Sequence, residues 1–213
     1  MSVNNNLFPD CTECKTLACI SGQKDNAPEN CPMIVEPGQL EAVQKKYQQG
    51  EIGKIACSAA RVEAEGYCSW TRIEEIIAFA RRAGYKRLGL AYCIGLRREA
   101  ARVNEIFTRC GFEVLSVVCK TGAAPKENLG LTDQEKVKPG HFEAMCNPVA
   151  QAGLLDRAGT DLNIILGLCV GHDTIFIRST TSPVTVLAVK DRVLAHNPLG
   201  AIYARHYFDR RFR

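Results

Sequence analysis

The chain has 213 residues, of which 46% are hydrophobic and 23% charged, an ordinary globular composition that allows one sizeable core and a small additional segment. Its net charge of +4 is a mild excess, and without a long basic run carrying interleaved aromatic residues we expect no nucleic-acid partner. No stretch is long and apolar enough to span a bilayer, and the N-terminus lacks the pattern of a signal peptide, so we expect a cytoplasmic protein without membrane contact.

The first segment, residues 1–36, is rich in Cys, Asn, Pro and Gly and has no hydrophobic periodicity. Such a segment cannot form a core of its own and usually needs a staple such as a metal. The chain contains 11 cysteines, and because the cytoplasm keeps thiols reduced, this number indicates metal ligation or thiol chemistry rather than disulfides. We therefore predict a Cys-rich metal-binding segment over residues 1–36, followed by a separate domain over residues 37–213.

Four cysteines of the first segment follow the spacing C-x2-C-x4-C-x11-C, with Pro32 directly after the last. Thiolate sets of this kind hold an iron–sulfur cluster or zinc. The Cys-Pro ending resembles the ferredoxin-type run and favours a cluster, most simply 4Fe-4S, whereas a zinc ribbon usually shows two close pairs and here there is one. Zinc and incidental thiols remain alternatives. The predicted metal ligands are Cys11, Cys14, Cys19 and Cys31.

A helical region leads into the second domain over residues 37–84. Apolar residues at helical spacing predict helices over residues 39–48 and 52–65. A third helix, over residues 72–83, begins at the capping pattern of Thr71 and Glu74 and ends at Gly84.

The chain then alternates between strands and helices. Near-continuous apolar runs predict strands over residues 87–92, 112–118, 161–168 and 184–189. The segments between them predict helices over residues 96–109, 148–157 and 172–178. Strands separated by helices favour right-handed crossovers, so we predict an α/β fold with an open, mostly parallel sheet, Rossmann-like or flavodoxin-like, and helices on both faces.

Cysteines follow three of these strands directly: Cys93, Cys119 and Cys169. A fourth, Cys146, lies just before a helix, where the helix dipole favours a thiolate. Open α/β sheets bind ligands beyond the carboxyl ends of the strands, at the point where strand order reverses, and an order of 2-1-3-4 brings the four cysteines together there. We predict a joint metal or cluster site. A thiol redox or persulfide site and simple core packing are the alternatives. Cys57 and Cys110 are interpreted as packing residues.

Two polar residues near these cysteines are candidate catalytic groups. His172 follows Cys169 in the sequence CVGHD and is able to act as a ligand or proton donor, although it equally suits a helix start. Lys120 follows Cys119 and is placed to hold an anionic substrate or offset cluster charge, the alternative being a solvated loop lysine. The polar loop over residues 121–140 has the length of a lid or binding loop over this site.

Nearly the whole chain resembles an uncharacterised family of bacterial and archaeal proteins known simply as metal-binding proteins. The resemblance is carried by the N-terminal cysteine segment and by the sequences AYCIGLRREA, VVCKTG, MCNPVAQA, NIILGLCVGHDTIFI and VTVLAVKDRVLAHNPLGAIY. It implies metal binding at the N-terminal cysteines but no particular reaction.

Together these features predict an iron–sulfur protein with two centres, of which the N-terminal one relays electrons and the strand-end one acts on a small molecule. A redox partner protein and a small-molecule substrate are the expected partners, and a homo-oligomer is left open. Two alternatives remain. One is a zinc-stabilised protein that binds a ligand or partner without catalysis. The other is a thiol or sulfur-transfer enzyme with a strand-end cysteine as nucleophile and His172 as its proton partner.

Overall fold

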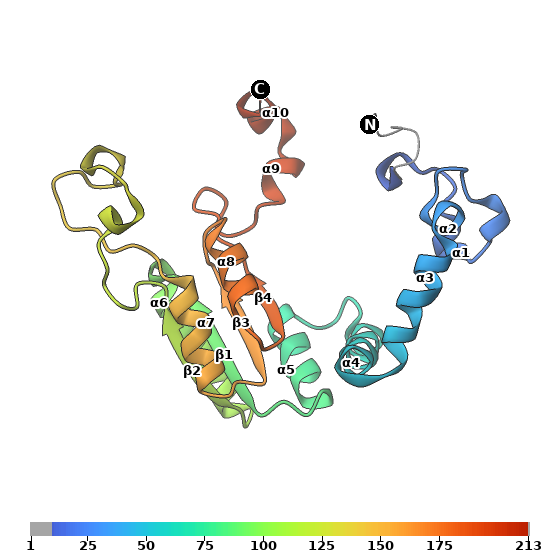
Figure 1. Cartoon of the computed structure of the whole chain (residues 1–213), viewed down its shortest axis with the longest axis horizontal. Coiled ribbons are helices and arrows are strands. Elements are labelled where there is room, and N and C mark those ends of the chain that lie inside the picture. The colour runs from blue at the N-terminus through green and yellow to red at the C-terminus, as the bar shows by residue number, and fades with distance from the viewer. Residues whose placement is uncertain (1–9, 213) are drawn as a thin grey trace. The chain divides into compact units, whose positions relative to one another are not determined.

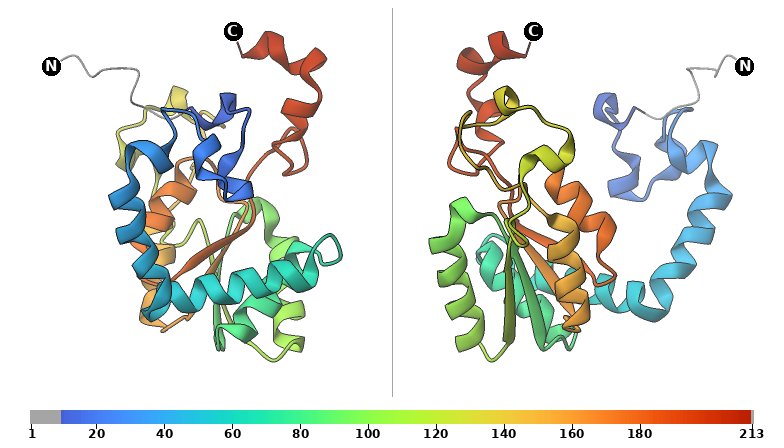
Figure 2. Two further views of the ribbon diagram at one scale, coloured as in Figure 1. Left: turned by 90° about the vertical axis from the view of Figure 1, so that its right-hand side faces the viewer. Right: turned by 60° about the vertical axis from the view of Figure 1, so that its left-hand side comes forward.

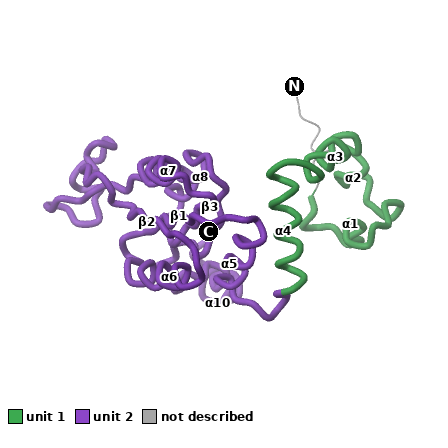
Figure 3. Tube along the Cα trace, turned by 90° about the horizontal axis from the view of Figure 1, so that it is seen from below, with its two compact units in different colours: residues 1–65 green, residues 66–213 purple. Residues whose placement is uncertain are grey.

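The computed structural model describes residues 10–212. It divides into two compact units, residues 1–65 and residues 66–213, which are coloured separately in Figure 3. The predicted helical lead-in is divided between them: two of its helices belong to the cysteine-rich unit, and the third belongs to the unit that contains the sheet.

The first unit consists of short helices and turns followed by one long helix. Its elements are η2 (Cys11–Glu13), α1 (Ala18–Ser21), η3 (Lys24–Asn26), α2 (Pro32–Val35), α3 (Pro37–Gln44), η4 (Lys45–Gln48) and α4 (Gly50–Gly66). Among its described residues, the buried hydrophobic side chains are Ala18 and Val62. A unit with so little buried apolar surface gains little from the hydrophobic effect, which agrees with the expectation that it cannot form a core by itself.

The second unit contains a four-stranded, all-parallel sheet (Figure 1). Its strands are β1 (Arg87–Tyr92), β2 (Glu113–Val118), β3 (Leu162–Leu166) and β4 (Val184–Ala188), in the order β2-β1-β3-β4. The predicted α/β fold and the parallel direction of the strands are confirmed, and the observed order is the one assumed in placing the strand-end cysteines together. β1 matches its apolar run, whereas β2 and β4 are one residue shorter and β3 is three residues shorter than predicted. At β3 and β4 the last residues of the run continue past the strand into the edge loops.

Helices cover both faces of this sheet (Figures 1 and 2). On one face, α5 (Arg72–Arg82) and α6 (Arg97–Arg109) pack through residues such as Ile76 and Phe107 against Leu88, Leu90 and Ile164. On the other face, α7 (Pro148–Arg157) and α8 (His172–Ser179) pack through Leu155 and Phe176 against Ala91 and Ile165. Successive strand residues point to opposite faces, so each apolar strand supplies both cores.

The remaining elements lie outside the sheet and its covering helices. A single turn, η5 (Ile94–Leu96), joins β1 to α6. The long segment between β2 and α7 contains η6 (Lys126–Leu129) and η7 (Asp133–Glu135), and the chain after β4 forms α9 (Gly200–Tyr203), α10 (Arg205–Phe208) and η8 (Asp209–Arg211). Over residues 10–212, no helix has both the length and the apolar character needed to cross a membrane.

Candidate functional site at the carboxyl edge of the sheet

The cysteines predicted to follow the strands lie at the carboxyl edge of the sheet. The ladder continues one residue past the strands, because the N–H of Cys93 donates to Leu166 O at 3.1 Å and that of Cys119 donates to Tyr92 O at 2.9 Å. Cys146 is brought to the same edge by its neighbour Asn147, whose N–H donates to Cys119 O at 2.7 Å. The same asparagine caps α7 by accepting from Ala150 N at 3.0 Å. Backbone pairing and one helix cap therefore assemble residues from three separate segments.

Three of the four cysteines belong to one apolar cluster at this edge, to which Cys93 and Cys119 contribute as buried residues and Cys146 as a partly buried one. Cys93 is 7% exposed and Cys119 is 2% exposed. The sulfur of Cys119 accepts a hydrogen bond from Ile94 N at 3.4 Å. Three cysteines in one cluster are more than packing requires, since any one of them can serve as a small hydrophobic residue.

Their surroundings change the acidity of the three thiols. Interaction with the thiol of Cys119, with a smaller contribution from the charge of Lys190, lowers the pKa of Cys93 to about 5. Interaction with Cys119, followed by the charges of Lys120 and His172, lowers the pKa of Cys146 to about 5. The pKa of Cys119 is raised by its interactions with these two groups and by burial. A lowered thiol pKa favours the thiolate, which is the form in which cysteine binds metals or attacks electrophiles.

The fourth predicted member, Cys169, lies outside this cluster. The half-buried residue accepts a hydrogen bond on its sulfur from Arg192 Nη2 at 3.0 Å. The next residue, Val170, is 92% exposed, so the loop after β3 is open to solvent. The structure thus places all four predicted cysteines at one edge, with three in one apolar cluster and the fourth paired with an arginine.

Cationic side chains surround the sulfur atoms. Lys120 donates to Ala144 O and to Cys146, which places this candidate residue at the site rather than in solvent. His172, the other candidate, begins α8 and contributes charge toward Cys146. Lys190 lies near Cys93 and contributes charge toward it, and Arg192 donates to the sulfur of Cys169. Lys190 and Arg192 follow β4, so strand-end reasoning applies to them equally, but this strand end carries no cysteine that would have marked them.

The two ends of the loop predicted as a lid are joined by backbone hydrogen bonds. Met145 N donates to Ala124 O at 2.8 Å, and Lys126 N donates to Glu143 O at 3.0 Å. Farther out, the side chain of Lys136 is only 4% exposed and pairs with Glu127 and Asp133 at 2.8 and 2.6 Å. Figure 1 shows the loop extending beyond the edge of the sheet between β2 and α7. Its role as a cover over the thiols stays a prediction.

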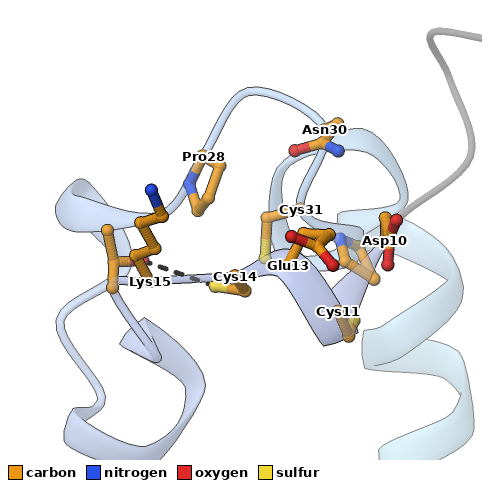
Figure 4. Close-up of a pocket in the computed structure, with 10 residues that line it drawn as sticks. Asp10, Cys11, Glu13, Cys14, Lys15, Pro28, Asn30 and Cys31 are labelled. Carbon is orange, nitrogen blue, oxygen red and sulfur yellow. Dashed lines mark hydrogen bonds between the residues drawn. The ribbon is translucent and has the colours of Figure 1, made fainter.

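The N-terminal cysteines form a looser group. Cys11, Cys14 and Cys31 line a pocket of about 250 Å³ together with Asp10 and Glu13 (Figure 4). Cys19 is not among the residues that line it and lies exposed in α1. Backbone hydrogen bonding at Leu17, followed by hydrogen bonding to Thr16, lowers the pKa of Cys14. Three of the four predicted ligands therefore share one pocket, with two carboxylates in the same wall.

Neither set is already arranged around an ion: across residues 10–212, no group of three or more His, Cys, Asp or Glu side chains stands ready to hold a metal. The donors nevertheless fit a thiophilic metal at the sheet edge. Two thiolates on a tetrahedral ion at a metal–sulfur distance of about 2.3 Å lie roughly 3.8 Å apart, which is a contact distance for sulfur.

The other cysteines are separate from both sets. Cys57 is exposed on α4, so its interpretation as a packing residue is wrong, because the apolar positions around it face a different side of the helix. Cys110 is half-buried against the α5–α6 core, as expected of a packing residue. Cys57 and Cys110 therefore provide matched positions at which a thiol can be removed without touching either candidate centre.

Comparisons with known proteins place the chain among uncharacterised relatives. Residues 31–187 match the family described as "Protein of unknown function (DUF1847)". An uncharacterised protein of Methanocaldococcus jannaschii is 42% identical over 200 residues, which cover 94% of this chain and 96% of that protein. No solved structure matches. The range matched by the family contains all four sheet-edge cysteines but, of the N-terminal four, Cys31 alone.

Proposed function

We propose that this chain, which belongs to the family of unknown function matched by its residues 31–187, is an iron–sulfur protein whose functional centre is held by the sheet-edge cysteines. The observation that carries the proposal is the convergence of Cys93, Cys119 and Cys146 in one apolar cluster at the carboxyl edge of the sheet, with Cys169 on the loop that leaves β3 at the same edge. Its expected role is redox chemistry or electron transfer, with a small molecule bound at the same edge.

The location favours a functional over a structural metal. Structural zinc sites stabilise segments that lack a core. The sheet-edge cysteines belong instead to a unit with a hydrophobic core on each face of its sheet, which needs no such support. They also lie where strand order reverses between β1 and β3, the place at which open α/β sheets bind ligands.

The charges around the thiols also fit such a centre. Three or four thiolates give any centre with a core charge of about 2+ a net negative charge. The side chains of Lys120, Lys190 and Arg192 contact the cysteines and offset that charge in a half-buried setting, where screening by water is reduced. Hydrogen bonds to cluster sulfur and nearby positive charge are the levers by which proteins set a cluster's reduction potential.

For the N-terminal unit we propose a second metal centre with a mainly structural role, bound through Cys11, Cys14 and Cys31. The reason is the scarcity of buried apolar side chains in the described part of that unit. Cys19, Asp10 or Glu13 is available as a further donor. Either zinc or a 4Fe-4S cluster suits such a site, and electron relay from it remains part of the hypothesis.

The test is anaerobic purification followed by analysis of iron, acid-labile sulfide and zinc. We expect iron and sulfide in the wild-type protein and a loss of the sheet-edge share in Cys93→Ser, Cys119→Ser and Cys146→Ser. Cys57→Ser and Cys110→Ser are the controls and should retain the full content. A colourless protein with stoichiometric zinc and no sulfide would refute the iron–sulfur assignment.

A thiol enzyme is the second candidate, favoured by the lowered pKa values of Cys93 and Cys146 beside a protonated Cys119. A thiolate next to a thiol is suited to thiol–disulfide exchange or sulfur transfer. This candidate predicts that one sheet-edge cysteine of metal-free protein is alkylated rapidly at neutral pH. Uniformly slow alkylation of the whole set would exclude it.

A further inference from the structure

The sheet-edge thiols are not equivalent, and the difference has a functional consequence that rests on the proposed metal centre. Cys93, Cys119 and Cys146 belong to one apolar cluster, whereas Cys169 accepts a hydrogen bond from Arg192 at 3.0 Å. A metal centre held by these three cysteines has one position without a protein thiolate. Functional metal sites characteristically keep such a position for water or substrate.

The surroundings of this position carry positive charge on the chain that leaves β4. The Nζ of Lys190 and the sulfur of Cys93 lie 3.6 and 3.9 Å from the position that a Cβ of residue 95 would occupy, so both groups face the same side of Gly95. Arg192 is exposed and donates to the sulfur of Cys169 at 3.0 Å. The loop that carries Cys169 is open to solvent at Val170, which is 92% exposed.

The carboxylates of the same loops are engaged elsewhere. The side chain of Asp191, between the two cations, accepts from Val193 N at 2.9 Å and Leu194 N at 2.8 Å, within its own turn. The side chain of Asp173 accepts from Thr174 N at 2.8 Å. Three thiolates on a centre of core charge about 2+ leave roughly one negative charge. The combined positive charge of Lys120, Lys190 and Arg192 is larger than this negative charge, so the site with its metal centre has a net positive charge that favours an anion.

We propose that Cys169 is not a permanent ligand, and that Lys190 and Arg192 hold a small carboxylate or oxyanion at the open position of the sheet-edge metal centre. Arginine supplies a planar fork that matches two oxygen atoms of one anion, and lysine adds a point charge on the side of Cys93. Without the anion, Arg192 donates to the sulfur of Cys169; when the anion binds, Arg192 donates to the anion instead. The substrate class of this site is thus a small anion with two oxygen atoms free to chelate or bridge.

The experiment uses the anaerobically purified, metal-loaded full chain, titrated with oxalate as the carboxylate probe and phosphate as the oxyanion probe. The readouts are the visible absorption and the electron paramagnetic resonance spectrum of the reduced centre. We expect a saturable spectral change with at least one probe. Arg192→Gln and Lys190→Gln should each weaken that binding at least tenfold with unchanged iron and sulfide content, and Arg192→Lys should be intermediate.

Two variants complete the test. Arg109→Gln removes a cation that is 72% exposed at the opposite end of α6, and it should bind the probes like the wild type. Cys169→Ser should keep its iron and sulfide, unlike Cys119→Ser. The inference is overturned if Cys169→Ser loses metal as fully as Cys119→Ser, or if neither probe gives a saturable change that depends on Arg192. A wild-type protein without metal would overturn the proposed function itself, so the two failures are distinguishable.

Discussion

Gly167, which joins the end of β3 to the loop that carries Cys169, offers a direct test of how the sheet edge is built. Its φ of +66° lies in the left-handed region, and a Cβ there would stand 2.1 Å from Leu96 Cδ1. Gly167 N also donates to Ala188 O at 2.7 Å, which holds the β3 and β4 ends together. Gly167→Ala therefore meets both a backbone and a packing penalty at the edge that presents the cysteines.

The magnitude follows from the two penalties. Placing a residue with a Cβ in the left-handed region costs about 1–2 kcal/mol. The new contact is about 1.4 Å shorter than the optimal carbon–carbon separation, so Leu96, only 5% exposed, must leave its rotamer or displace its neighbours. Overpacking of this kind typically costs 1–3 kcal/mol. We expect Gly167→Ala to lower the free energy of unfolding by about 2–5 kcal/mol.

The assay is anaerobic urea denaturation of the full chain, followed by the fluorescence of Trp70, the single tryptophan, which belongs to the unit that contains the sheet. Gly171→Ala is the matched control, because Gly171 has a φ of +83° but no atom within 4 Å of its Cβ position. Gly171→Ala should lower the free energy of unfolding only by the cost of the left-handed backbone conformation. In a Leu96→Ala background, Gly167→Ala should likewise cost only about 1–2 kcal/mol.

The reasoning about Leu96 would be refuted by a Gly167→Ala variant no less stable than Gly171→Ala. It would also be refuted if the two substitutions, Gly167→Ala and Leu96→Ala, were strictly additive. A metal-loaded Gly167→Ala protein adds a functional readout: we expect altered spectra of the sheet-edge centre, because the substitution displaces the turn after Cys93 as well as the loop before Cys169.

Three further predictions concern other parts of the chain. Gly89→Ala should destabilise the sheet unit by about 2–4 kcal/mol in the same denaturation assay, because its Cβ would lie 2.0 Å from the buried Asn163 Oδ1, which accepts from Thr160 Oγ1 at 2.8 Å. Lys136 lowers the pKa values of Glu127 and Asp133, so these ion pairs stabilise the loop above the ordinary carboxylate pKa and are lost as the pH falls through the lowered values. Hydrogen exchange over residues 126–143 should accordingly show weaker protection at pH about 3 than at pH 7, with Lys136→Met losing protection already at pH 7. Removing metal with a chelator, or introducing Cys14→Ser, should increase amide hydrogen exchange over residues 10–35 while the sheet stays protected. Equal protection of these residues with and without metal would contradict a structural role for the N-terminal centre.

The sequence alone was sufficient for the elements of the sheet unit. Apolar runs and helix caps predicted the four strands and their connecting helices to within a few residues, and α7 and β1 with no error at either end. These signals are local: a capping asparagine, a first-turn proline and a buried run act within one turn or one strand. The strand order was an assumption at that stage, because several orders of parallel strands joined by helices can cover both faces of a sheet, and the structure fixed it as β2-β1-β3-β4.

The sequence also predicted that cysteines would meet at the carboxyl edge, since a strand end is a position along the chain. Which of them touch could not be predicted in this way. Cys146 reaches Cys119 through a hydrogen bond made by Asn147 across a segment of more than twenty residues, and Cys169 turns to Arg192 on the chain after β4. Contacts between side chains on separate segments depend on loop paths and rotamers, which no local pattern encodes.

What the sequence determined by itself is therefore the fold class and the list of thiols, because both depend on periodicity and on position relative to strand ends. The tertiary structure decided that Cys93, Cys119 and Cys146 belong to one apolar cluster, that Lys190 and Arg192 bring positive charge to the sheet-edge cysteines, and that Cys19 lies outside the pocket lined by Cys11, Cys14 and Cys31. The physical reason is that thiol acidity and metal fit depend on distances across a packed edge, and these are fixed only when the whole sheet has formed.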